Sequence, residues 1–138
     1  MPRYEGQTDQ TKRIVLTPEV TRAFWSRRRA WQGVEVKLFI ETRYLKDGTP
    51  LKIEIWEDGT DEAAGDELVT KLTGDFTVRN GRCVATYKIR FDQAELGKAL
   101  ELEGDTCEFY FLVTVEKPLL KRRSNLLYVD LQPLVLSA

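Results

Sequence analysis

The chain has 138 residues, of which 42% are hydrophobic and 31% are charged, and this balance is typical of a globular protein with one core. Its 21 basic and 22 acidic side chains nearly cancel, so the basic excess on which a general nucleic-acid or membrane-surface binder depends is missing. Composition therefore argues against wholesale disorder, against a membrane partner and, less strongly, against a nucleic-acid partner.

No stretch approaches the roughly 20 consecutive apolar residues that span a bilayer. Residues 1–7 also lack the apolar segment of a secretory signal, so we expect folding in the cytoplasm, with export as part of an assembly left open. Cys83 and Cys107 are too few for a disulfide framework, and buried, reduced thiols are the expectation. A bridge between them would require neighbouring strands across the core.

The N-terminal region begins with a polar tail, residues 1–10, followed by a single domain over residues 11–138. A strand is predicted at 12–16. Residues 18–31 are ambiguous, because a Thr-Pro-Glu start is typical of a capped helix, whereas the alternation from Val20 equally suits a strand.

Two alternating segments follow, over residues 34–41 and 51–56. Each has one apolar face and one mostly charged face, which is the period of a half-buried strand. Asp47-Gly48 lies between the two segments, and Pro50 marks the start of the second. The pattern predicts that the two segments pair as a hairpin.

A second hairpin is indicated by Asn80-Gly81, the pair favoured in a type I′ turn, with predicted strands over 76–79 and 82–89 on either side. Another strand is predicted at 68–72. These short segments, separated by turn residues, are typical of an all-β protein.

The C-terminal third contains the run CEFYFLVTV at 107–115, which is apolar on both faces after Glu108 and indicates a central strand. A last strand is predicted at 125–131. Asp92-Gln93-Ala94-Glu95 resembles a capping box, so one short helical turn is expected to reach about Leu100.

The sequence contains no histidine, which excludes triad chemistry within the chain and removes the usual general base. Two cysteines without histidine cannot make a closed zinc site, and no phosphate-binding glycine-rich loop is present. We therefore expect no catalytic residue, no cofactor and no metal, and a protein that is not an enzyme.

The acidic segment 57–67 carries six carboxylates between predicted strands. A solvated loop is the favoured interpretation; a Ca²⁺ site is a weaker alternative, since the spacing does not match an EF-hand, and carboxylate catalysis is weaker still. Four of its residues are candidates for partner contact: Asp58, Asp61, Glu62 and Asp66.

Two basic runs are the counterpart of this acidic loop. They are Arg27, Arg28 and Arg29, between two tryptophans, and Lys121, Arg122 and Arg123, before the last predicted strand. They are solvated loops, or they associate with a protein partner or with the acidic loop of a second copy, or, least favoured, they bind nucleic acid.

Phe39 and Trp56 are out of phase with the apolar faces of their segments, so alternation places both on the outside. Exposed aromatic side chains often mark interfaces. If the two strands pair, the two residues form one apolar patch. The alternative is that an N-terminal segment or residues 18–31 cover them.

The succession of Gly33 before an alternating strand, Lys46-Asp47-Gly48-Thr49-Pro50 before LKIEIWE, the acidic loop, and Val78-Arg79-Asn80-Gly81-Arg82 before ATYKI resembles the immunoglobulin-like modules of bacterial proteins, including those attached to phage-tail and secretion-spike components. The resemblance covers 33–131. It implies an immunoglobulin-like antiparallel β-sandwich of about seven to nine strands. The cysteine positions and the lack of a tyrosine corner do not support an antibody-type relationship.

The expected function is that of a non-catalytic structural or adaptor module, which contacts a protein partner or self-associates in a larger complex. The alternative is a module that binds carbohydrate or another small ligand, with aromatic side chains stacking on sugar rings. Its candidates are Trp25, Trp31, Trp56 and Tyr44.

Overall fold

The structure, a computed structural model, describes residues 15–59, 65–90 and 106–130. These residues form an all-β fold of nine strands in two mostly antiparallel sheets. Sheet A has the order β1-β3-β6, and sheet B has the order β2-β9-β7-β4-β5 with β8 also paired to β7. Within this part of the chain no helix has the length and hydropathy that crossing a bilayer would require.

The strand bounds follow the predicted segments closely in the middle of the chain. Sheet A consists of β1 (Glu19–Trp25), β3 (Glu35–Arg43) and β6 (Arg82–Lys88). Sheet B consists of β2 (Arg29–Trp31), β4 (Lys52–Glu57), β5 (Glu67–Lys71), β7 (Thr106–Val115), β8 (Leu120–Arg123) and β9 (Leu127–Asp130).

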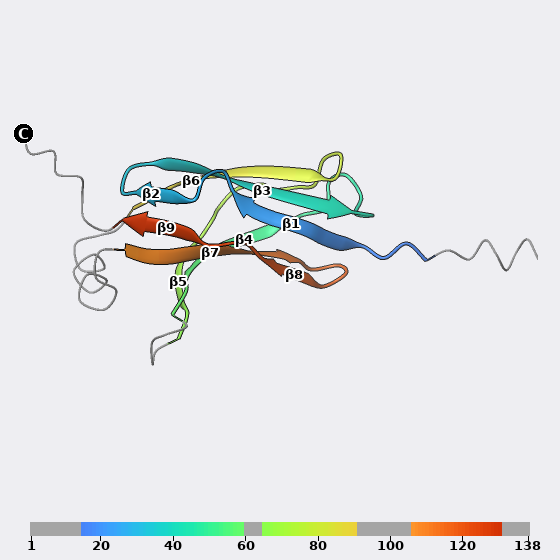
Figure 1. Cartoon of the computed structure of the whole chain (residues 1–138). Helices are drawn as coiled ribbons and strands as arrows, with labels where there is room; N and C mark the ends of the chain where they lie inside the picture. Colours follow the sequence, from blue (N-terminus) through green and yellow to red (C-terminus); the bar gives the residue numbers. More distant parts are fainter. Residues whose placement is uncertain (1–14, 60–64, 91–105, 131–138) are drawn as a thin grey trace, which may run out of the picture.

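The two sheets pack face to face around one hydrophobic core, with β3 and β6 in the upper layer of Figure 1 and β7 and β8 in the lower one. The alternating apolar residues of both layers meet there, and burial of each such side chain contributes about 1.5–3 kcal/mol. The largest fully buried members include Leu38 and Ile40 from sheet A, and Ile53, Phe109 and Phe111 from sheet B.

The prediction of a central strand at 107–115 is confirmed by β7. This strand pairs with β4 along one edge, and with β9 and then β8 along the other. The change of partner occurs beside Phe111, whose N–H donates to Ser124 Oγ at 2.9 Å and whose carbonyl accepts from the Ser124 N–H at 2.9 Å. The buried Ser124 hydroxyl thus keeps the ladder satisfied where β8 ends and β9 has not begun.

The predicted hairpin of 34–41 with 51–56 is wrong. Strand β3 pairs with β1 and β6, whereas β4 pairs with β5 and β7, so the two segments belong to different sheets. Asp47 and Gly48 lie in the crossing between layers, where the Gly48 N–H donates to Val78 O and Asp47 Oδ1 accepts from the Asn80 N–H. Alternation identified the buried face of each strand but not the strand with which it pairs. The apolar faces of β3 and β4 are buried because the two strands lie in opposite layers and face each other across the core.

The turn at Asn80-Gly81 is confirmed. Both residues have positive φ, 52° and 76°, as a type I′ turn requires, and Arg79 and Arg82 exchange two backbone hydrogen bonds. The strand predicted at 76–79 is wrong, because Phe76 and Val78 turn away from β6 and bond to Leu51 and Thr49 instead.

The ambiguous region 18–31 forms two strands, β1 and β2. The register of β1 against β3 shifts between Val20 and Arg22, so the buried residues are Val20, Ala23 and Trp25. This irregularity breaks the period of two, and it explains why the sequence also fits a helix. Strand β2 is short and runs parallel to β9.

The remaining predictions divide into three groups. The strands at 68–72 and 125–131 are confirmed as β5 and β9. Val15 and Leu16, at the end of the strand predicted at 12–16, are exposed and not in a strand. The polar tail at 1–10 and the helical turn at 92–100 lie outside the described residues. Cys83 and Cys107 are buried free thiols, one in each sheet.

Candidate contact surfaces

Each sheet carries a row of apolar side chains across its outer face. On sheet B, neighbouring strands place Tyr110 opposite Trp56, and Trp56 opposite Leu68. On sheet A, Phe24 lies opposite Phe39, and Phe39 opposite Val84. Cross-strand pairs of this kind stabilise a sheet, but an apolar row on an outer face is also a surface on which a partner can dock.

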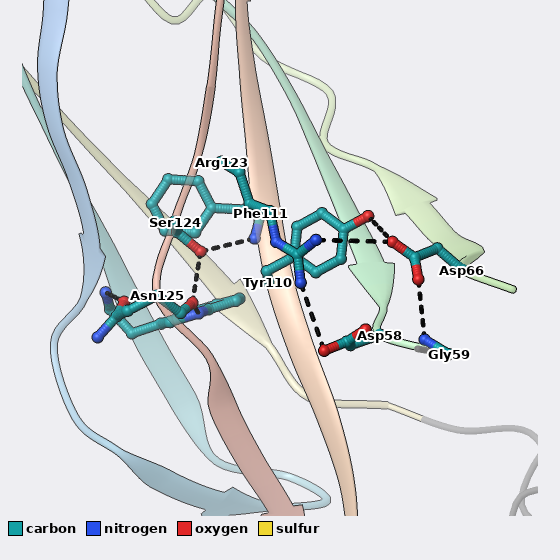
Figure 2. Close-up of polar contacts among 9 residues, drawn as sticks. Asp58, Gly59, Asp66, Tyr110, Phe111, Arg123, Ser124 and Asn125 are labelled. Carbon is teal, nitrogen blue, oxygen red and sulfur yellow. Dashed lines mark hydrogen bonds and ion pairs between the residues drawn. The ribbon is translucent and has the colours of Figure 1, made fainter. Parts of the chain in front are cut away.

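The sheet B row is covered at one end by a polar cluster, shown in Figure 2. The Arg123 guanidinium lies 3.8 Å from the centre of the Tyr110 ring. It also lies 3.3 Å from Asp58 Oδ2 and 3.8 Å from Asp66 Oδ2. Tyr110 is consequently only 7% exposed, although its strand directs it outward. Arg123 of β8 thus stacks on Tyr110 of β7 and pairs with two carboxylates of the acidic loop, and these contacts hold the two strands and the loop together.

Asp66 receives hydrogen bonds from two donors in this cluster. The Tyr110 hydroxyl donates to Oδ2 at 2.5 Å, and the Gly59 N–H donates to Oδ1 at 2.9 Å. These hydrogen bonds, with a smaller contribution from the charge of Arg123, lower the pKa of Asp66 from its ordinary value. Burial, followed by the hydrogen bond to Asp66, raises the pKa of Tyr110 to about 12. Asp66 is therefore ionised and Tyr110 neutral across the physiological range.

The acidic loop is closed at its base by two glycines. A Cβ atom on Gly59 would overlap the carbonyl oxygen of Gly65, so only glycine fits at position 59 while the backbones lie this close. This contact brings Asp58 and Asp66 to the same point on the sheet. Asp61 and Glu62 lie outside the described residues.

The outer face of sheet A has no comparable polar cover among the residues that the structure describes. Phe24 and Phe39 stack with their ring centres 5.3 Å apart, and the Arg22 guanidinium lies over Phe24 at 4.3 Å. Val84, at the β6 end of the row, is 53% exposed. The row is thus partly shielded on β1 and open on β6.

Among the described residues, the outer edge of β6 is also open beyond its first residue, Arg82. Arg82 exchanges its backbone hydrogen bonds with Arg79 on the side away from β3, whereas Ile89 exchanges its bonds with Gly33 and Val34 on the β3 side. Successive residues of an antiparallel strand point their backbone N–H and carbonyl groups to alternate sides. Val84, Thr86 and Lys88 therefore direct these backbone groups away from β3. No backbone group of the described residues pairs with those three.

A groove of about 350 Å³ runs beside this edge, where β6 diverges from the segment before the Asn80-Gly81 turn. Its walls combine apolar, polar and charged side chains. The lining residues are Asp75, Phe76, Thr77, Arg79, Arg82, Cys83 and Val84.

The two residues proposed from the sequence as one apolar patch are on opposite outer faces. Phe39 lies on sheet A and is partly covered by Phe24, from the 18–31 region. Trp56 lies on sheet B, half-buried, and its Nε1–H donates to Glu54 Oε1 at 3.1 Å. They are separated because β3 and β4 do not pair.

The first basic run lies around the start of β2. Arg27 donates to the Arg29 carbonyl and lies 5.0 Å from the Trp31 ring centre, while Arg29 pairs with Asp130 at 2.6 Å. Arg28 is exposed, and its carbonyl accepts from the Tyr128 N–H. These contacts anchor β2 to β9.

The second basic run lies on β8, where Lys121 and Arg122 are exposed and Arg123 enters the cluster on Tyr110. The charge complementarity expected between a basic run and the acidic loop of another molecule is thus realised within one chain by Arg123, Asp58 and Asp66. The described residues contain no group of three or more side chains suited to hold a metal ion.

Sequence reasoning missed Tyr110, Phe24 and Val84. Tyr110 was hidden in a run that is apolar on both faces, and the bulge in β1 obscured the outward phase of Phe24. For Val84 a usable signal was present: it stands between Cys83 and Ala85, so the alternation of β6 already placed it on the outside.

Comparisons with known proteins add little to this geometry. No protein-family model and no curated protein matches the chain. A structure of the Pseudomonas fluorescens alkylpurine DNA glycosylase AlkC, bound to DNA containing an abasic site analog, is similar over 82% of this chain, with 10% identity and a TM-score of 0.45. The match spans only 30% of that chain. At this level the likeness assigns no function.

Proposed function

We propose that this protein is a non-catalytic module that contacts another protein through the outer face of sheet A. The observation that carries the proposal is the row Phe24, Phe39 and Val84, which ends open beside an edge strand with unpaired backbone groups. An apolar row and a free edge on one sheet supply both the burial and the hydrogen bonds that protein partners use.

A non-catalytic role is supported by the state of the two described acidic-loop candidates. Asp66 accepts from Tyr110 and Gly59, and Asp58 pairs with Arg123. Carboxylates held in this way tie a loop to a sheet. A general acid would instead need a raised pKa, and the pKa of Asp66 is lowered.

The carbohydrate-binding alternative finds no shared aromatic platform among the described candidates. Trp25 is buried and packs edge-on against Phe111. Trp31 lies under Arg27, Trp56 bonds to Glu54 on sheet B, and Tyr44 follows β3 of sheet A. Side chains dispersed in this way do not present one surface to a sugar.

We further propose that the sandwich is immunoglobulin-like and that its role is structural, as an adaptor in a larger assembly of the phage-tail or secretion-spike kind. Support comes from the sequence resemblance over 33–131, and from the two-sheet architecture in which the chain crosses between layers after β3. The assembly itself is proposed on the resemblance alone.

The proposal is tested by site-specific photo-crosslinking in cells that encode the protein. A photoreactive residue replaces Val84 in one variant and Leu119, which is 68% exposed in the β7–β8 turn, in the control. We expect a protein partner to crosslink from position 84 and not from position 119.

The captured partner is then purified and titrated against Val84→Glu and Leu119→Glu. A charge placed in the apolar row should raise Kd at least tenfold, while both variants keep their unfolding free energy within about 1 kcal/mol, the most that the cross-strand pair of Val84 with Phe39 is expected to contribute. Equal affinity of the two variants, or crosslinking only from position 119, would overturn the proposal.

A further inference from the structure

The geometry of the β6 edge points to the chemistry of the partner. We infer that β6 accepts an extended segment of another protein as a fourth strand of sheet A, and that this segment carries acidic side chains at its outward positions. The inference deepens the proposed function and rests on it.

The backbone of β6 is prepared for strand addition. Val84, Thr86 and Lys88 each direct one N–H and one carbonyl away from β3, and these groups have no backbone partner among the described residues. A strand laid along this edge would form main-chain hydrogen bonds with three alternate residues. That is the bonding of β-augmentation, in which the backbone supplies affinity and the side chains supply specificity.

The charge pattern of sheet A predicts the side chains of the added strand. One row across the sheet runs Arg22, Glu41 and Arg82, and a second runs from Glu35 to Lys88. Signs alternate from strand to strand in both rows. The position beyond Arg82 is already filled by Arg79, its partner across the turn, whereas the position beyond Lys88 has no backbone partner among the described residues. Opposite charges on neighbouring strands stabilise pairing, so the position beyond Lys88 favours a carboxylate. The other end of an added strand would approach Arg82 and Arg79, where a carboxylate is favoured as well.

The two terminal cations are available for such a partner. Neither Arg82 nor Lys88 has a carboxylate within ion-pair distance among the described residues, although Glu41 and Glu35 are their cross-strand neighbours. Arg79, also exposed, adds a third positive charge at the turn. Asp75 is the opposing charge in this region, on the wall of the groove.

The same charges disfavour a second copy of this chain. A two-fold pairing centred on Thr86 would bring Arg90 of each copy to the end of β6 in the other copy where Arg82 and Arg79 lie, and all three arginines are exposed. Like charges directly opposite each other destabilise a pair of strands, and cations on an edge are a common barrier to edge-to-edge association. The edge therefore selects against itself and for an acidic segment.

The groove defines a second requirement on the segment. Side chains of an added strand alternate between the outer face and the inner side, and the inner position beside Cys83 would face the groove wall that includes Phe76. An apolar side chain is expected there. The predicted segment thus carries acidic side chains, together with hydroxyl-bearing or apolar ones, on its outward side, and apolar side chains on its inward side.

The probe for this pattern is the acetylated and amidated heptapeptide Glu-Val-Thr-Val-Val-Val-Glu. Its first glutamate aligns with Lys88 of the full-length protein, and its last lies beyond the residue opposite Val84, at the end near Arg82 and Arg79. The control probe has lysine in place of both glutamates. We expect the acidic probe to bind at least tenfold more tightly in NMR titration. Its addition should slow amide hydrogen exchange at Val84, Thr86 and Lys88 and leave Cys83 and Ala85, which are already in the β3 ladder, unchanged.

Thr86→Pro removes the outward N–H in the middle of the edge, where proline is tolerated because the group faces away from β3. It should weaken binding at least tenfold, whereas Thr86→Ala should bind within twofold of the wild type. Should Thr86→Pro not fold, an acidic probe N-methylated on the amides that face β6 tests the same bond with wild-type protein, and it should also bind at least tenfold more weakly.

Three results would overturn the inference: equal binding of the acidic and lysine probes, protection at amides outside β6, or a dimer through β6 in sedimentation. Its failure is distinct from failure of the proposed function. If the partner captured at Val84 binds Thr86→Pro with the same affinity as Thr86→Ala, the proposed contact through the outer face of sheet A is retained and the inference of strand addition is wrong. If no partner is captured at Val84, the proposed function falls by itself.

Discussion

The two outer faces of this protein carry similar apolar rows, and among the described residues the polar cover is more extensive on sheet B than on sheet A. On sheet B, Arg123, Asp58 and Asp66 converge on Tyr110. On sheet A, the row ends at Val84, which is half exposed on an edge strand. The sheet B row also reaches an edge strand, at Leu68 on β5, which is 43% exposed. The difference therefore lies in how firmly the other end of each row is covered: by one arginine on sheet A, and by an arginine paired with two carboxylates on sheet B.

The largest expected effect compares two serines that perform the same task in the two sheets. Ser124 Oγ accepts the Phe111 N–H in the buried ladder of sheet B, and Ser26 Oγ accepts the Lys37 N–H at the exposed end of β1. Ser124→Ala leaves a buried donor unsatisfied, which costs about 1–3 kcal/mol. Ser26→Ala should cost less than about 0.5 kcal/mol, since water replaces the lost acceptor. Urea unfolding measures both.

If the two serine variants cost the same, the junction between β8 and β9 would not depend on the Ser124 hydroxyl. A changed m-value would instead show that the variant alters the surface exposed on unfolding.

A smaller effect is expected from removing the cation over Tyr110. Arg123→Met should lower the unfolding free energy by about 1 kcal/mol, because partly exposed ion pairs of this kind contribute up to that amount. Arg122→Met, one position away on β8 and exposed, is the matched control and should be near neutral. The difference between the two variants should shrink in high salt, and a difference insensitive to salt would contradict an electrostatic role for Arg123.

The smallest effect concerns pH. The pKa of Asp66 is lowered in the folded state from its ordinary value of 3.8. The ionised carboxylate therefore stabilises the fold at pH values above 3.8, and this stabilisation is lost as the pH falls through the folded-state pKa. Wild type should therefore be more stable than Asp66→Asn near pH 7, with the difference in unfolding free energy shrinking below pH 3.8.

The control for this titration is Asp75→Asn, because Asp75 has an exposed carboxylate without a hydrogen bond to the described residues. Its difference from wild type should be the smaller one. A constant difference between wild type and Asp66→Asn across the acid range would show that Asp66 titrates normally.

At alkaline pH, Tyr110 stabilises the fold in its neutral form. This contribution is present below pH 10 and is lost as the pH rises through the folded-state pKa of about 12.

Local patterns predicted those parts of the fold that depend on neighbouring residues. The apolar run at 107–115 predicted the central strand β7, and Asn80-Gly81 predicted its turn through the positive φ that both residues tolerate. The predicted pairing of 34–41 with 51–56 was wrong, because the segment that connects them can either turn back within one sheet or cross to the other sheet, and in this protein it crosses. Both paths bury the same faces.

The candidate surfaces were less predictable than the strands. Phe39 and Trp56 were correctly placed outside their strands, but the sheets put them on opposite faces. Arg123 and the pair Asp58 and Asp66 were singled out as charges, and their meeting on one Tyr110 ring depends on the register of β7 with β4 and β8. Tyr110 could not be identified within a run that is apolar on both faces after Glu108.

By itself the sequence determined that the protein is built from short strands, and which face of most of them is buried, because a period of two is a local property of the chain. Only the tertiary structure decided which strands are neighbours, where the charges of the chain cover an apolar row, and which of the described strands lie at the edge of a sheet. Those outcomes depend on contacts between residues far apart in the sequence, where packing of the whole core selects one arrangement among several that satisfy the same local pattern.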